Sequence, residues 1–155
     1  PPSPQPRLLG LLSPRLHRPT RHADSLTSIG DYAFSGCTSL ASVTLPAGLV
    51  SIGISAFADC SSLGSVAFPA GLTSIGLLAF SGCSSLARAI FPAGLTSIRD
   101  HAYNGCTSLA SVTFPVGLTS IGRYAFHGSA LSRVTVPTTA TIGEAAFSPV
   151  TTVLR

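Results

Sequence analysis

Apolar residues recur along this chain at a fixed interval of 23 positions. In every copy of the pattern an Ile is followed five positions later by an aromatic residue. The copies lie at Ile29 and Phe34, Ile52 and Phe57, Ile75 and Phe80, Ile98 and Tyr103, and Ile121 and Phe126. One further copy, at Ile142 and Phe147, follows after 21 residues, because two single deletions fall in connecting segments. A period of this length indicates a repeat protein in which each repeat is one supersecondary unit.

The first part of each unit alternates between apolar and polar residues. Val43 and Leu45 alternate with Ser42 and Thr44, and a Pro closes the run. This period of two predicts a short strand at 40–45, with the Val and the Leu facing inward. Equivalent strands are predicted at 63–68, 86–91, 109–114 and 131–136, with one last strand in 150–155.

The second part of each unit predicts a turn, another extended stretch and a helical turn. The sequence Pro-Ala-Gly-Leu after the strand is typical of a turn, and Leu-Thr-Ser-Ile-Gly predicts an extended segment with Ile29 inward. Residues 31–37 allow about one helical turn, with Phe34 inward and Gly36 as its C-terminal stop. Asp59 takes the Gly36 position in the second copy, and Asp tolerates a left-handed backbone.

One unit cannot bury its own apolar face, but stacked copies can. We therefore expect residues 23–155 to form an α/β repeat solenoid of about five to six coils, each with one short parallel strand and a short helical turn. Five such strands would make a sheet about 19 Å wide. Residues 1–22 are rich in Pro and Arg and are interpreted as a disordered tail or a degenerate cap. Neither end has a recognisable cap, which predicts either a longer array or end-to-end self-association.

The net charge of the chain comes from its first residues. The net charge is +4, but residues 1–22 hold four Arg and no acid, while the other five Arg balance five acids. The repeats therefore offer no cluster of cations for nucleic acid, and no nucleic-acid partner is expected. No apolar run approaches the ~18 residues of a membrane span. The chain has no Met, so it is interpreted as a fragment or a processed product.

The four Cys residues also recur once per unit. Cys37, Cys60, Cys83 and Cys106 are 23 positions apart, whereas zinc sites use close pairs such as C-x₂-C. Stacked coils bring equivalent Cα atoms within disulfide range. However, stacked equivalents have parallel Cα–Cβ vectors, and a disulfide needs vectors that converge. We therefore expect buried free thiols that pack as small apolar residues.

Few other side chains indicate chemistry. His101 and His127 lie near Asp100 and Arg123 in neighbouring units, but no nucleophile is arranged with them. We expect solvated residues here rather than an acid–base pair. The repeats offer no catalytic, cofactor-binding or metal-binding residues, so the chain is not expected to be an enzyme.

One set of equivalent outward positions changes between charged and apolar residues along the chain. It contains Asp31, Ile54, Leu77, Asp100, Arg123 and Glu144. Its last three members alternate in sign, which predicts a surface ion ladder. Ile54 and Leu77, with the adjacent Leu78, form an outward apolar patch. That patch is either a contact site or a product of local packing within the turn.

The unit resembles the BspA-like type of leucine-rich repeat through the pattern C-x-x-L-x-x-V-x-L/F-P-x-G-L-x-S-I-G-x-x-A-F, over roughly residues 26–147. The resemblance implies a curved, right-handed leucine-rich-repeat superhelix that binds other proteins and carries no catalytic residues. It also implies an extracellular or cell-surface location, while the residues themselves leave a cytoplasmic one open. The chain departs from the pattern at Arg99 in place of Gly, at Ala89 in place of Val, and in the Cys that the 21-residue unit lacks. The first two departures bear on local packing around the fourth strand-to-turn region, not on the fold.

The outward positions of the predicted strands are the candidate partner-binding surface, because leucine-rich repeats commonly carry their partners on this sheet. The candidates are Ser42, Thr44, Ser65, Arg88, Ile90, Ser111, Thr113, Arg133 and Thr135. Only Arg88 and Arg133 are charged, and no acid faces them. These two Arg either hold an acidic group of a ligand or are simply solvated.

We therefore expect a non-catalytic leucine-rich-repeat module for surface-type or adhesion-type interaction with a protein partner, without a cofactor. The first alternative is a structural spacer, or a fragment with no binding role of its own. A remote alternative is an ice-binding or surface-binding solenoid, in which ranks of Thr order water. Thr44, Thr113 and Thr135 form such a rank, but Ala67 and Ile90 interrupt it.

Overall fold

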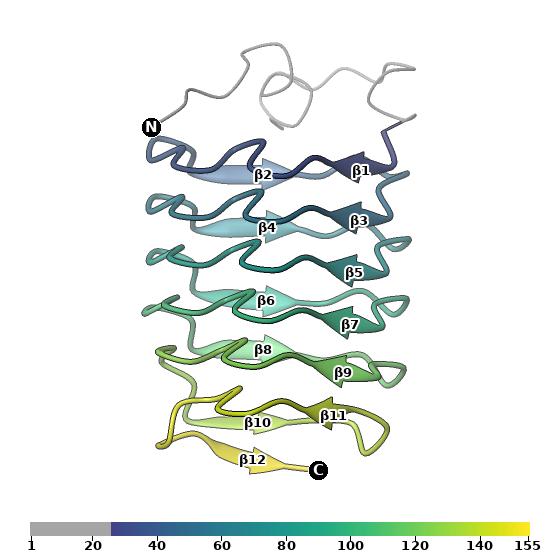
Figure 1. The fold of residues 1–155 in the computed structure, drawn as a ribbon, viewed down its shortest axis with the longest axis vertical. Coiled ribbons are helices and arrows are strands. Elements are labelled where there is room, and N and C mark those ends of the chain that lie inside the picture. The colour runs from purple at the N-terminus through teal and green to yellow at the C-terminus, as the bar shows by residue number, and fades with distance from the viewer. Residues whose placement is uncertain (1–25) are drawn as a thin grey trace.

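The computed structural model describes residues 26–155, which form a stack of coils along one axis (Figure 1). Each coil contributes one strand to each of two columns. The first column contains β1 (Ser28–Ile29), β3 (Ser51–Ile52), β5 (Ser74–Ile75), β7 (Ser97–Ile98), β9 (Ser120–Ile121) and β11 (Thr141–Ile142). The second contains β2 (Ser42–Thr44), β4 (Ser65–Ala67), β6 (Arg88–Ile90), β8 (Ser111–Thr113), β10 (Arg133–Thr135) and β12 (Thr152–Leu154). The predicted tail or cap at 1–22 lies outside the described residues.

The first column is one continuous parallel sheet of six strands, in the order β1-β3-β5-β7-β9-β11. Its register pairs each Ser with the next Ser and each Ile with the next Ile, as at Ser51↔Ser74 and Ile52↔Ile75. The 21-residue unit keeps this register, because Ile142 pairs with Ile121. The two deletions are therefore absorbed in the connections, as the sequence predicts.

The second column is three separate two-stranded sheets, β2-β4, β6-β8 and β10-β12. The prediction of one continuous sheet in this column is therefore wrong. Each strand has three residues, and in the first five coils a Pro without an N–H follows two residues later. A ladder here has few possible hydrogen bonds, and pairing lapses at alternate coils. The predicted last strand is present as β12.

The predicted helical turn is also wrong, since residues 26–155 contain no helix. Alternate N–H groups in this segment donate to the next coil instead: Tyr32 to the Ile54 carbonyl at 2.8 Å and Phe34 to the Ala56 carbonyl at 2.7 Å. The N–H groups between them close turns within their own coil, as Ala33 does to Gly30. A helix would use all of these donors internally and leave none to join the coils.

Two positions in each of the first five of these turns, and one in the sixth, have a left-handed backbone. The Gly36 position has φ of 75° at Gly36, and Asp59 adopts 59° at the equivalent place, as predicted. The second position carries no Gly in any coil, and its φ values lie between 51° and 61°. Its members are Tyr32, Ser55, Leu78, His101, Tyr124 and Ala145. A left-handed backbone is unfavourable in free energy for a residue other than Gly. The hydrogen bonds between coils must therefore offset this cost along the stack.

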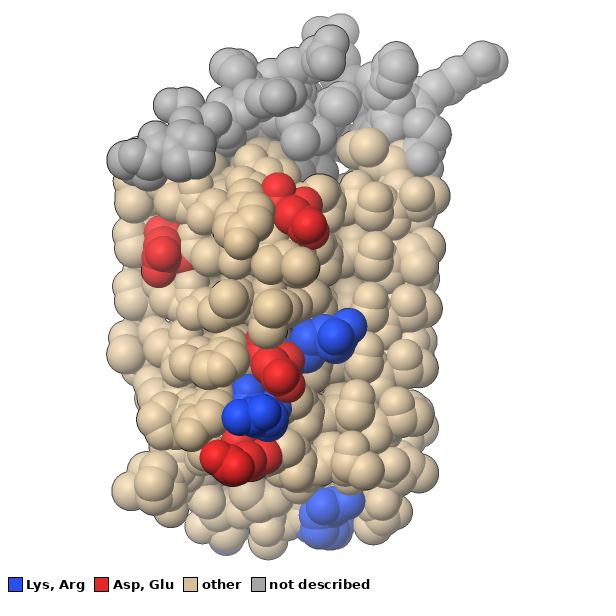
Figure 2. All heavy atoms as spheres, viewed as in Figure 1, with Lys and Arg blue, Asp and Glu red and all other residues tan. Residues whose placement is uncertain are grey.

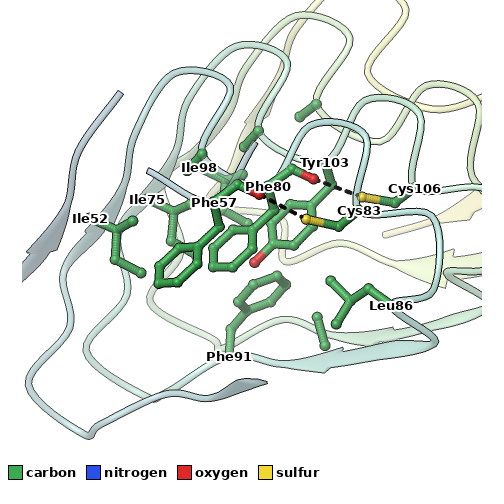
Figure 3. Packing of buried hydrophobic residues seen from close by; sticks show 14 of the residues in the cluster. Ile52, Phe57, Ile75, Phe80, Cys83, Leu86, Phe91, Ile98, Tyr103 and Cys106 are labelled. Atoms are coloured by element: carbon green, nitrogen blue, oxygen red, sulfur yellow. Dashed lines mark hydrogen bonds between the residues drawn. The ribbon is translucent and has the colours of Figure 1, made fainter. Parts of the chain in front are cut away.

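The core between the two columns is built from stacked equivalents. The aromatic residues form a continuous pile of nearly parallel rings (Figure 3), with centroids 5.1–5.5 Å apart and interplanar angles of 3–8°. Phe91 and Phe114 meet this pile edge-on from the second column. Stacked and edge-on pairs add to the free energy gained from burial alone.

The two departures from the repeat leave the fold intact. The Arg99 N–H donates to the Ile75 carbonyl at 3.0 Å, just as the N–H of Gly76 donates to Ile52 one coil earlier. Ala89 is buried and pairs with Val112 in the ladder between β6 and β8. The described residues therefore form a parallel β-solenoid of about six turns.

Candidate functional site

The outward side chains of the second column form one surface, here called the strand face. All nine predicted partner-binding residues lie on it, and all are exposed. The ladders place Ser42 beside Ser65 and Arg88 beside Ser111. In the neighbouring row of side chains on the same strands, Ile90 lies beside Thr113. The structure therefore brings the predicted residues together in two straight rows, as expected from the register.

The strand face is one coil longer than the predicted residues. β12 pairs with β10, so Thr152 lies beside Arg133 and Leu154 beside Thr135. The sequence predicted a last strand in 150–155 but gave no signal that it would lengthen this face. Ile90 is 62% exposed and Leu154 is 41% exposed. The face therefore offers two apolar contacts near its two arginines.

Arg88 and Arg133 are the only charged residues of the strand face. Both are exposed, and no ion pair within 4.0 Å forms anywhere in residues 26–155. Ser111 lies between them in the same row. Their strands, β6 and β10, are therefore two strand intervals, or about 10 Å, apart. Their guanidinium groups are therefore available to a carboxylate or other acidic group of a ligand.

The Cys column is buried and free of disulfides among the described residues, as predicted. Each of three thiols donates to the carbonyl of the aromatic residue one coil earlier: Cys60 to Phe34, Cys83 to Phe57 and Cys106 to Phe80, all at 3.1 Å. Figure 3 shows the bonds of Cys83 and Cys106. This hydrogen bond was not foreseen from the sequence.

Burial also determines the reactivity of these thiols. It raises the pKa of Cys60 and that of Cys106 to about 12. It raises the pKa of Cys37 and Cys83 as well. Because the thiolate is the reactive form, these residues are suited to packing rather than to nucleophilic or redox chemistry.

The predicted ion ladder does not form. Figure 2 shows basic and acidic side chains alternating in a short row, but none of them forms an ion pair within 4.0 Å in the described chain. The acids bind backbone instead: Asp31 accepts from the Ile54 N–H and Asp100 from the Arg123 N–H, both at 2.9 Å. A charge-assisted bond to the next coil thus replaces the expected side-chain pairs.

The two described histidines lie in a small ring cluster. His101 stacks on Tyr124 with centroids 5.1 Å apart, and His127 meets the same Tyr edge-on. Asn104 hydrogen-bonds the Nδ1 of His101 at 2.8 Å. No group of three or more His, Cys, Asp or Glu in residues 26–155 is arranged to hold a metal ion.

Two further features matter less for recognition. Leu77 and Leu78 are half-buried and Ile54 is exposed, so the predicted apolar patch is small. A rank of three successive Thr residues runs beside the first column rather than on the strand face. Thr73, Thr96 and Thr119 there donate their hydroxyl protons to carbonyls of the preceding coil. Their hydroxyls therefore join the coils.

Comparison with known proteins identifies relatives of the whole repeat region. The profile of a family described as "BspA type Leucine rich repeat region" matches residues 23–153 in 6 copies. No curated protein matches the chain. Within the described residues, no helix is long and apolar enough to cross a membrane.

Three solved structures illustrate the likeness. A T. pallidum leucine-rich repeat protein (TpLRR) has 31% identity and a TM-score of 0.71, over 93% of this chain and 66% of its own. A leucine-rich cell surface protein from Faecalibacterium prausnitzii A2-165 has 32% identity and a TM-score of 0.60, over 81% of this chain and 41% of its own. The pneumococcal vaccine antigen PcpA has 25% identity and a TM-score of 0.70, over 83% and 35%. The chain thus spans less than two thirds of each.

Proposed function

Because the chain belongs to the BspA-type leucine-rich repeat family, we propose that it is a non-catalytic module that binds another protein through its strand face. The observation that carries the proposal is the exposure of Arg88 and Arg133 in one straight row, with no acid to pair them in residues 26–155. An interface gains most from a few anchors, among which Arg is enriched.

The partner is a protein that presents an acidic group beside an apolar side chain. The acidic group would pair with Arg88 or Arg133, and a planar carboxylate fits the fork of a guanidinium. Ile90 and Leu154 would contact the apolar side chain. The remaining hydroxyls of the face add hydrogen bonds but little affinity, because Ser and Thr are seldom hot spots.

We place this module outside the cell or at the cell surface. Support comes from two of the structural relatives, one named a cell surface protein and one a vaccine antigen. The chain covers only part of each, so the location of the whole protein is part of the same proposal.

The test is quantitative affinity capture with three forms of the chain, from extracellular and cell-surface protein of the source cells. They are wild type, Arg88→Ala/Arg133→Ala, and Arg99→Ala/Arg123→Ala as a charge-matched control outside the strand face. We expect the affinity for the captured partner to fall about tenfold for each strand-face arginine removed, at ~1.4 kcal/mol each. The fall should occur in Arg88→Ala/Arg133→Ala and not in the control. Equal recovery by all three forms contradicts the strand-face proposal. Recovery no better than that of bare resin favours a structural spacer.

A further inference from the structure

The strand face is interrupted at two places inside the stack. In the second column no ladder joins β4 to β6 or β8 to β10, and described coils lie on both sides of each break (Figure 1). Because the ladders β2-β4, β6-β8 and β10-β12 alternate with these breaks, the pattern repeats every two coils. The two breaks are therefore equivalent positions, two coils apart.

Inward side chains are less well covered beside each break. Val43, Ala89 and Val134 lie in the first strand of each pair, and all three are buried. The equivalent residues of β4 and β8 are Val66 and Val112, and both are only half-buried. Each break therefore leaves part of an apolar side chain accessible.

A backbone donor is also left unpaired at each break. In the three ladders, the N–H just after the first strand donates to the second strand, as Phe91 does to the Thr113 carbonyl at 3.2 Å. The equivalent N–H groups after β4 and β8 belong to Phe68 and Phe114. Neither has an acceptor in residues 26–155. Both breaks thus offer the same hydrogen-bond donor.

The two arginines of the strand face lie at the same two places. Arg88 is the first residue of β6, across the first break from Ser65, and Arg133 is the first residue of β10, across the second break from Ser111. Neither arginine forms an ion pair within 4.0 Å in the described chain. Each break therefore combines a free guanidinium, an accessible Val and an unpaired N–H. Two strand intervals, or about 10 Å, separate the two sets.

We propose that the strand face has two matched subsites, one at each break, for a protein segment in the polyproline II conformation with two acidic side chains three residues apart. This inference rests on the proposed function and specifies the partner of the strand face. Charge complementarity requires an acidic group at each arginine, because no acid of the face itself supplies one.

The conformation of the segment follows from the spacing of the arginines. A polyproline II helix turns once in three residues and rises about 9 Å in that turn, so side chains at i and i+3 lie on one side near the required distance. In a β-strand, residues i and i+3 point to opposite sides. A polyproline II segment also makes no internal hydrogen bonds, which leaves its carbonyls available to the Phe68 and Phe114 N–H groups. An α-helix bonds all but its last carbonyls internally.

The first test is the binding of short Pro-rich peptides, measured by isothermal titration calorimetry. A peptide with the core Glu-Pro-Pro-Glu is compared with Glu-Pro-Pro-Gln, and with a peptide of equal charge whose two Glu are adjacent. We expect the first peptide to bind wild type about tenfold more tightly than either of the others, because it alone engages both arginines. Arg88→Ala and Arg133→Ala should each abolish this preference, while Arg99→Ala/Arg123→Ala should keep it. Equal affinities for the three peptides, or no binding, overturn the inference.

The second test is hydrogen exchange at three equivalent amides. Phe68 and Phe114 should exchange faster than Phe91 in the free chain, because only the Phe91 N–H donates to a neighbouring strand. The Glu-Pro-Pro-Glu peptide should slow exchange at both. Equal exchange at all three amides in the free chain, or protection of only one break by the peptide, contradicts the two subsites. Loss of a captured protein from Arg88→Ala/Arg133→Ala, without any preference among the peptides, would contradict the subsites alone and leave the strand-face proposal standing.

Discussion

The interior coils and the 21-residue coil that ends at Phe147 differ in what holds them. An interior coil has a ring stacked on each side, a thiol that donates to the coil before it, and a backbone ladder on both edges. The last coil keeps its ring 5.5 Å from Phe126, but it has no Cys. The ring pile and the ladder are thus sufficient to seat a coil, and the thiol is an addition.

Inward and outward positions of the coils also differ in how strictly they repeat. Inward positions repeat in kind from coil to coil because each must fit both neighbours, while outward positions change freely between Ser, Thr, Arg and Ile. A residue that interrupts an inward column therefore carries a structural cost. One that interrupts an outward column, such as Arg88, is a candidate for function.

The largest expected difference between the two regions comes from removing a ring. Phe80→Ala should lower the free energy of unfolding by about 3–5 kcal/mol, because Phe80 is fully buried between Phe57 and Tyr103. Phe147→Ala should cost about half as much, since its ring is stacked on one side only. Urea denaturation measures both values. Equal losses would mean that the last coil is packed like the interior.

A second difference concerns the glycines that begin five of the six turns. A Cβ at Gly122 would lie 2.5 Å from the Asp100 N and 2.6 Å from the Arg99 carbonyl carbon, whereas a Cβ at Gly30 meets nothing within 4 Å. Gly122→Ala should therefore destabilise the chain by about 1–3 kcal/mol. Gly30→Ala should stabilise it by about 0.4–1 kcal/mol, through the unfolded state. Thermal unfolding of the pair measures the contrast, and a shift of the same sign in both contradicts it.

The ring pile itself contains one mismatch. The Tyr103 hydroxyl is buried and has no hydrogen-bond partner in the described residues. Tyr103→Phe should raise the free energy of unfolding by about 1–2 kcal/mol, because it removes a desolvated polar group. Phe80→Tyr, one coil earlier, is the reciprocal variant and should destabilise. If Tyr103→Phe lowers stability in denaturant titrations, the hydroxyl has a partner after all.

The smallest effect is expected for a thiol. Cys83→Ala removes one hydrogen bond to the Phe57 carbonyl, which still accepts from the Cys60 N–H at 3.3 Å. The loss should be about 1 kcal/mol, and Cys83→Ser should recover part of it by restoring a donor. Hydrogen exchange at the Cys60 and Cys83 amides reports the local change. A loss as large as that of Phe80→Ala would show that the thiol holds the coil.

The stacking of the buried side chains could be predicted from the sequence, but the hydrogen bonding of the backbone could not. The 23-residue period predicts that Ile, Phe and Cys stack on their equivalents, because only like residues can fill a repeated space. It does not say which extended segment forms the continuous sheet. The one-helical-turn interpretation of residues 31–37 failed because period alone cannot distinguish bonds within a coil from bonds between coils. Tyr32 and Phe34 give their N–H groups to the next coil.

The strand face was predictable for a related reason. Alternation puts Ser42, Thr44 and their equivalents outward whatever their partners are, so all nine candidates are exposed. The ion ladder failed because equal spacing in sequence fixes the position of a side chain but not its partner. Asp31 and Asp100 instead accept hydrogen bonds from backbone N–H groups of the next coil, whose positions are fixed by the fold.

The repeated Cys acts as a packing residue rather than as a reactive one. Thiol titration of the full chain at pH 8, with and without denaturant, tests it most directly. Burial raises the pKa of all four thiols, so the native chain should hold them protonated and slow to react. We expect four thiols that react rapidly only after unfolding. Fewer than four under denaturing, non-reducing conditions, or a rapid reaction in the native chain, would contradict it.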